Sequence, residues 1–218
     1  MQKRIGSLLL LVSCLAYATA ARAGILYKNG PVNGICDIES CQGDAWLINY
    51  GNSITSSFSV AGNSTITGID FAIWTTSGES LASVDWSIGT SSFGRNLGSG
   101  IASGANLSET LLFVNQYGYD ISLVSISRLN IDVTSGNTYW VTLDNASGVP
   151  NGAPVYWDEN NGPSQVYQTN EGSIPSESFN IVGNSGSGST PEPSSIFLFG
   201  SGIVGVADVL RRKLWKSD

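Results

Sequence analysis

Arg128–Val133, which reads RLNIDV, alternates strictly between polar and apolar side chains. In an extended backbone Leu129, Ile131 and Val133 fall on one face, and the polar residues between them fall on the other. A period of two is typical of a β-strand with one buried and one solvated face. The hexapeptide therefore predicts a half-buried strand in a layered all-β protein.

The same alternation recurs through the middle of the chain, where no stretch shows a helical period. It appears in Ile69, Phe71 and Ile73, in Val84, Trp86 and Ile88, in Tyr139, Val141 and Leu143, and in Phe179 and Ile181. Clusters of turn-forming residues separate these runs, at residues 61–63, 76–78, 135–137 and 160–163. The pattern predicts an antiparallel β-sandwich of jelly-roll type with about eight to ten strands. Residues 95–107, rich in Gly and Ser, are expected to form a long loop.

The first 23 residues predict a secretory signal peptide. Two basic residues precede an apolar stretch, and Ala21-Arg22-Ala23 supplies a small-residue cleavage motif before Gly24. Ala18-Thr19-Ala20 is a second cleavage motif, and Leu11–Cys14 matches a lipid-attachment motif, so both alternatives stay open. Cleavage before Gly24 is the preferred interpretation. It leaves residues 24–183 as the β-sandwich ectodomain, 184–190 as a Gly/Ser linker and 191–218 as a C-terminal segment.

Removal of the leader leaves two cysteines, Cys36 and Cys41. In an oxidising compartment this pair predicts a disulfide that closes a small loop, which is worth about 2 kcal/mol in the chain-entropy estimate. The chain contains no histidine. A Ser-His-Asp triad, a Cys-His dyad and a histidine-ligated metal are therefore excluded.

The exported part of the chain is strongly acidic. Between Gly24 and Thr190, three basic residues stand against 14 Asp and Glu, a net charge of −11. A surface of this charge repels nucleic acid and anionic lipid. We therefore expect no nucleic-acid partner, and nothing in the sequence calls for an organic cofactor.

Asp158, Glu159 and Asn160 carry the most suggestive polar side chains. A glycosidase needs two carboxylates across one bond, but in an extended strand Asp158 and Glu159 face opposite sides, so we expect no enzyme. Solvated loop charges are the alternative interpretation. Asp158 and Asn160 also offer hard oxygen ligands, which makes them candidate calcium ligands, although their spacing matches no complete calcium loop.

Trp140, Tyr156 and Trp157 are the candidate sugar-binding residues. Aromatic side chains cluster in this part of the sequence where strands meet loops, and aromatic faces pack against the apolar faces of sugars. The alternative is that such rings belong to the core, since Tyr139 and Trp157 fit inward strand positions.

The C-terminal segment begins with Pro191-Glu192-Pro193, which the two prolines hold extended. Ser194–Leu210 follows with 17 residues, about 25 Å of helix against a hydrocarbon core of roughly 30 Å. It predicts a single transmembrane helix that just spans the bilayer. Basic residues after it place the C-terminus in the cytoplasm and the ectodomain outside.

A Pro-Glu-Pro motif, an apolar helix and a basic cluster, in this order at the chain's end, resemble the PEP-CTERM protein-sorting signal of Gram-negative bacteria. The resemblance covers residues 191–218 and implies processing by exosortase, a membrane-embedded cysteine protease. It implies that Pro191, Glu192 and Pro193 form the recognition element and that Arg211, Arg212 and Lys213 form the basic retention cluster. Asp208 departs from the pattern, because the family's apolar segment is usually uncharged.

The ectodomain also resembles an uncharacterised secreted β-rich domain found on proteins with this signal. Residues 68–89, 137–146, 155–164 and 172–183 carry that resemblance, which implies no known activity.

Together these features predict a non-enzymatic exported protein. The secretion translocon and signal peptidase would act on its leader. The protein would first be tethered to the inner membrane with its ectodomain in the periplasm. After exosortase processing it would reach the cell envelope or the extracellular matrix. The alternative is a carbohydrate-binding or carbohydrate-active module of the exopolysaccharide matrix.

Overall fold

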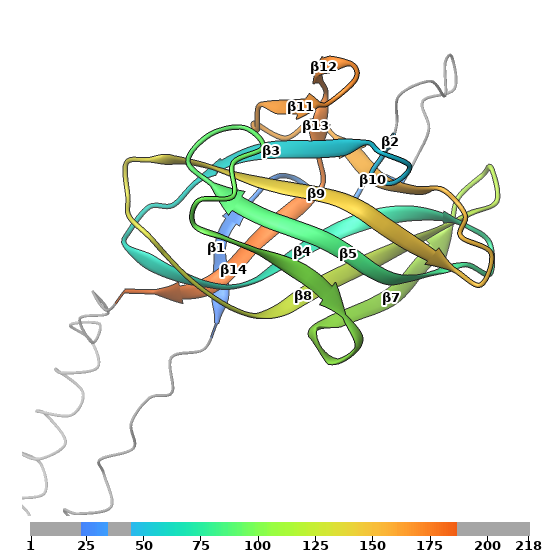
Figure 1. Ribbon diagram of the computed structural model, residues 1–218, viewed down its shortest axis with the longest axis horizontal. Helices are drawn as coiled ribbons and strands as arrows, with labels where there is room; N and C mark the ends of the chain where they lie inside the picture. The colour runs from blue at the N-terminus through green and yellow to red at the C-terminus, as the bar shows by residue number, and fades with distance from the viewer. Residues whose placement is uncertain (1–22, 35–44, 187–218) are drawn as a thin grey trace, which may run out of the picture. The chain divides into compact units, whose positions relative to one another are not determined.

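The structure, a computed structural model, describes residues 23–34 and 45–186. Within these ranges the chain forms fourteen strands, one 3-10 turn, η1 (Gly104–Asn106), and no α-helix (Figure 1). The strands are β1 (Gly24–Lys28), β2 (Ala45–Leu47), β3 (Ser53–Ser59), β4 (Ser64–Thr76), β5 (Ser80–Gly89), β6 (Gly98–Ser103), β7 (Leu107–Val114), β8 (Tyr119–Val133), β9 (Thr138–Val149), β10 (Val155–Asn160), β11 (Val166–Gln168), β12 (Gly172–Ile174), β13 (Ser176–Glu177) and β14 (Phe179–Ser185).

The strands form two antiparallel sheets. In the eight-stranded sheet the order is β1-β14-β4-β10-β13, with β2 also paired to β10, β8 paired to β4, and β7 paired to β8. In the six-stranded sheet the order is β12-β11-β3-β9-β5-β6. The longest ladder joins β4 to β8, from Ser64 opposite Val133 to Thr76 opposite Tyr119.

Apolar side chains from both sheets share one core, so the two layers form a β-sandwich (Figure 1). Phe71 and Ile73 of β4 and Val141 and Leu143 of β9 belong to this core. The RLNIDV stretch lies in β8, with its three apolar side chains buried and its three polar side chains exposed. The all-β class and the alternation that predicted it are confirmed, and the jelly-roll connectivity stays a prediction.

A second, smaller apolar cluster covers part of the outer face of the eight-stranded sheet. Trp74 and Ile121 are buried there, and Val32 and Tyr156 are among the partly buried residues packed against them. Trp74 alternates with Ile73 of the main core, so this stretch of β4 is buried on both faces. The segment before residue 35 supplies the cover.

Two expectations about strands were wrong. The described residues hold fourteen strands against the predicted eight to ten, because β2, β11, β12 and β13 are too short to show alternation. Residues 95–107, predicted as a loop, contain β6, which pairs with β5. A Cβ at Gly98 in β6 would lie 2.8 Å from Ile131 Cδ1, so a larger residue there would require the end of that side chain to shift.

Several predicted features lie outside the described residues. They are the signal peptide, which apart from Ala23 lies in residues 1–22, the cysteine pair Cys36 and Cys41, most of the 184–190 linker, and the whole 191–218 segment with its transmembrane helix. In the part of the chain that is described, no helix is long and apolar enough to cross a membrane. The last strand runs to Ser185, two residues beyond the predicted end of the ectodomain.

Candidate functional site

Asp158 is a buried carboxylate that holds the chain segment before residue 35 against the sheet. Its oxygens accept hydrogen bonds from the backbone N–H groups of Asn33 and Gly34, both at 2.8 Å, and from Trp74 Nε1 at 2.7 Å. A carboxylate that accepts several N–H groups is well satisfied when buried. The interpretation of Asp158 as a solvated loop charge was wrong, because it lies fully buried in β10.

Asn160 is also engaged in the fold. Its Nδ2 donates to the carbonyl oxygens of Asn29 and Pro31, and its Oδ1 accepts the N–H of Gly162 at 2.8 Å. Both candidate calcium ligands are therefore hydrogen-bonded within the fold, and the calcium site stays a prediction. Among the described residues, no group of three or more Asp, Glu, Cys or His is arranged to hold a metal ion.

The three candidate sugar-binding aromatics do not form one surface. Trp157 is 0% exposed, packs edge-on against Phe71 and Phe179, and donates its Nε1–H to the carbonyl of Ser178 at 2.9 Å. Its assignment to a sugar site was wrong, because the ring has no accessible face.

Trp140 and Tyr156 lie on opposite outer faces of the sandwich. Each alternates with core residues, Trp140 on β9 of the six-stranded sheet and Tyr156 on β10 of the eight-stranded sheet. Trp140 packs against Tyr167 with ring centroids 5.6 Å apart, and Tyr156 packs edge-on against Tyr119. The grouping of Trp140, Tyr156 and Trp157 was therefore incorrect.

Glu177 is the most unusual ionisable group of the described residues. It is 0% exposed, and neither carboxyl oxygen has a hydrogen-bond partner. Glu159 lies directly opposite on β10, and its Oε2 accepts the Trp46 Nε1–H at 2.9 Å. Burial, followed by the charges of Glu159 and Asp158, raises the pKa of Glu177 well above its usual range. A carboxyl sealed from solvent in this way does not contact a substrate in this structure.

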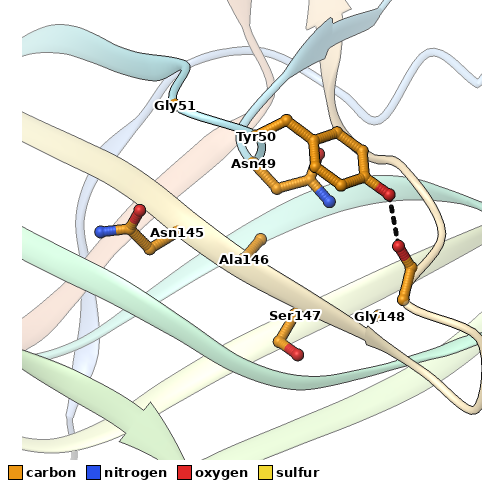
Figure 2. Close-up of a pocket in the computed structure, with 8 residues that line it drawn as sticks. Asn49, Tyr50, Gly51, Asn145, Ala146, Ser147 and Gly148 are labelled. Carbon is orange, nitrogen blue, oxygen red and sulfur yellow. Dashed lines mark hydrogen bonds between the residues drawn. The ribbon is translucent and has the colours of Figure 1, made fainter.

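One open pocket, which we name the Tyr50 pocket, lies between the β2–β3 turn and β9 (Figure 2). Its volume is about 380 Å³. Its lining consists of a tyrosine with small or polar residues, namely Asn49, Tyr50, Gly51, Asn145, Ala146, Ser147, Gly148 and Gly152. Neither Lys nor Arg and neither Asp nor Glu belongs to this lining.

Two lining residues have left-handed backbone conformations that non-glycine residues rarely adopt. Tyr50 has φ +52° and Asn145 has φ +47°. Asn145 lies where the register between β5 and β9 shifts, between the Asp85–Asp144 and Ser83–Ser147 pairs. This β-bulge re-aims the following residues, so the Ala146 N–H leaves the β3 ladder and donates to the Ile48 carbonyl at 3.0 Å.

Hydrogen bonds hold the walls of the pocket. The Tyr50 hydroxyl donates to the carbonyl oxygen of Gly152 (Figure 2). Asn49 is buried and ties the turn to the next loop, since its Nδ2 donates to the Ala153 carbonyl at 3.1 Å and its Oδ1 accepts the Val155 N–H. This site was not predicted from the sequence. The only local signal was the turn-forming composition of residues 48–52.

The charged groups Asp85, Asp144 and Arg95 next to the pocket are held by a hydrogen bond or an ion pair. Asn145 Nδ2 donates to Asp85 Oδ2 at 3.0 Å, and Arg95 forms an ion pair with Asp144 at 2.9 Å. Burial raises the pKa of Asp144, while the Arg95 charge and the Ser53 hydroxyl oppose that rise. The pocket itself is therefore lined by neutral groups.

Residues 189–213 match the family model described as the PEP-CTERM protein-sorting motif. The chain carries a PEP-CTERM sorting signal. The match includes Pro191, Glu192, Pro193 and the basic residues 211–213, all outside the described residues. A PEP-CTERM signal marks an exported, membrane-anchored protein that exosortase processes. A comparison with curated proteins finds no match to this chain.

Proposed function

We propose that this PEP-CTERM protein is a non-enzymatic component of the cell surface or extracellular matrix. The observation that carries the proposal is the order of the chain. A β-sandwich ends with β14 at Ser185, and the sorting motif occupies residues 189–213. In this proposal the β-sandwich is the domain that is exported, and the sorting signal that follows it in the sequence determines where it is delivered.

The roles of three buried carboxylates support a non-enzymatic, structural role for the exported domain. Asp158 anchors the segment before residue 35. Glu79 is buried and accepts both the backbone N–H and the side-chain amide of Asn151. Asp144 pairs with Arg95. Each of these groups stabilises the fold, which is the expected pattern for a domain that does not use them in catalysis.

In this proposal the secretion translocon and signal peptidase process residues 1–23, and residues 191–218 anchor the chain in the inner membrane. The ectodomain then folds in the periplasm, where Cys36 and Cys41 form a disulfide. Exosortase cleavage near Pro191-Glu192-Pro193 passes the ectodomain to the cell envelope or the matrix.

The location of a Glu192→Ala variant tests this proposal. We expect it to remain in the membrane fraction with an intact C-terminus, because exosortase no longer recognises the motif. Fractionation with mass spectrometry of the last peptide measures this. A Glu171→Ala variant, which changes an exposed glutamate of the ectodomain, should be processed like the wild type. Equal processing and location of all three chains would contradict the proposal.

Carbohydrate binding is the second candidate function, and the Tyr50 pocket is the observation that favours it. The pocket combines an exposed aromatic ring with neutral polar groups, as ligand sites commonly do. A glycan array probed with the mature protein tests this function. Binding to matrix polysaccharide would support carbohydrate binding. An array without any bound glycan would contradict it, and the structural role would then be the one remaining candidate.

A further inference from the structure

We infer that the Tyr50 pocket binds a single neutral sugar ring. The inference rests on the carbohydrate-binding candidate function and gives it a site and a ligand class. The proposed site differs from Trp140, Tyr156 and Trp157, the sugar-binding residues that the sequence had indicated.

The size and floor of the pocket fit one ring. Its volume of about 380 Å³ lies at the lower end of the range for ligand pockets, roughly 300–1,000 Å³. Gly51 and Gly152 contribute no side chains, and a Cβ on either would meet no other atom within 4 Å, so a ligand can approach the backbone closely there. A pocket of this size with open backbone at two glycines can accommodate a single sugar ring.

Tyr50 supplies a rigid aromatic wall. Its side chain is 64% exposed, yet the hydrogen bond from its hydroxyl to the Gly152 carbonyl fixes the ring orientation. A ring that is held at one end and open along its face is pre-organised for stacking on an apolar face of a ligand.

The backbone conformation provides an independent argument. The described residues include four non-glycine residues with positive φ, and two of them, Tyr50 and Asn145, line this one pocket. Left-handed conformations cost free energy in residues with a Cβ and cluster at ligand sites. Glycine would fit both positions without strain, so replacing Tyr50 or Asn145 by glycine removes the side chain without distorting the backbone.

The chemistry of the lining selects a neutral, hydroxylated ligand. Ser147 offers an exposed hydroxyl, and Asn145 keeps its amide oxygen as an acceptor because its Nδ2 donates to Asp85. A purely apolar ligand would leave these groups unpaired. An anionic ligand would find no cation in the lining, beside an ectodomain whose net charge is −11.

Titration of the mature protein with defined glycosides tests the inference. The probes are the methyl glycosides of glucose, galactose, mannose and N-acetylglucosamine, with glucuronate as the anionic probe, followed by calorimetry and saturation-transfer NMR. We expect at least one neutral glycoside to bind and glucuronate to bind more weakly. Tighter binding of glucuronate would overturn the choice of a neutral ligand.

Tyr50→Gly is the decisive variant because it removes the ring at a position where φ is +52° and glycine is unstrained. The fold should therefore survive, which circular dichroism checks, while the affinity falls by about tenfold or more. Tyr50→Phe keeps the ring but removes the hydrogen bond that orients it, so it should bind more weakly than the wild type and more tightly than Tyr50→Gly. Trp140→Ala changes an aromatic residue outside the pocket and should bind as the wild type does.

The outcomes separate the site from the function. Binding that survives Tyr50→Gly, or that Trp140→Ala abolishes, overturns the Tyr50 site and leaves carbohydrate binding standing. No binding to any glycoside, together with a silent glycan array, overturns both. The export proposal is tested separately by the location of the Glu192→Ala variant.

Discussion

At the scale of single residues, Glu177 destabilises the folded state when it is ionised. It lies fully buried across from Glu159, with no hydrogen-bond partner for either oxygen. Its pKa is raised, chiefly by burial. The folded state thus binds the Glu177 proton more tightly than the unfolded state. Its stabilising contribution is complete below the unfolded pKa, about 4.3, and is lost as the pH rises through the folded pKa.

Glu177→Gln should therefore stabilise the domain at neutral pH. We expect the free energy of unfolding to rise by about 0.5–2 kcal/mol, because the amide removes the ionisation and keeps the shape. Urea unfolding between pH 4 and pH 8 measures the effect, and the difference between variant and wild type should grow with pH. Glu171→Gln, at an exposed glutamate, is the control. A constant difference across this range would contradict the assignment.

At the scale of elements, β10 organises the eight-stranded sheet. It pairs with β4, with β2 and with β13. Its inner face carries Trp157 into the core, and its outer face carries Asp158 and Asn160 against the segment before residue 35. One strand of six residues thus connects the core, the outer apolar cluster and the N-terminal segment.

Asp158→Ala should release the segment that this strand holds. It leaves the N–H groups of Asn33, Gly34 and Trp74 without their acceptor, so we expect a loss of about 3 kcal/mol in stability. Hydrogen exchange should become faster at Asn33 and Gly34. Asp132→Ala, which changes an exposed aspartate of β8, should leave exchange at these two amides unchanged. Unchanged exchange in Asp158→Ala would show that the segment is held by other contacts.

At the scale of the whole molecule, the acidic charge opposes the compact state. With three basic residues against 14 acidic ones between Gly24 and Thr190, repulsion acts across most of the ectodomain at low ionic strength. Raising NaCl from about 10 mM to about 500 mM shortens the screening length from about 30 Å to a few Å.

The unfolding temperature should therefore rise with NaCl by about 2–4 °C, which corresponds to roughly 1 kcal/mol for a protein of this size. Differential scanning calorimetry measures it. The double variant Asp132→Lys/Glu171→Lys, which reduces the negative charge at two exposed sites, should show a smaller rise. An equal rise in both proteins would mean that salt acts by another route than screening.

The sequence by itself determined the all-β class of the domain and the presence of a sorting signal in the chain. Alternation at Leu129, Ile131 and Val133 is a local consequence of the pleat, so it predicts buried and exposed faces without knowledge of the partner strand. The sorting signal is likewise a linear motif, read in order along the chain. The Gly- and Ser-rich composition of residues 95–107 led to the wrong prediction of a loop there, because the pairing of β6 with β5 joins segments that no local pattern relates.

Only the tertiary structure decided which polar and aromatic residues are free to act. Asp158, Asn160 and Trp157 looked functional by residue type, but partners far away in the sequence occupy each of them. The Tyr50 pocket combines a turn near residue 50 with a bulge near residue 145. Burial and hydrogen bonding depend on which segments contact each other in the folded protein. In this sandwich the contacts join strands that are far apart in the sequence, so no local stretch of the chain predicts them.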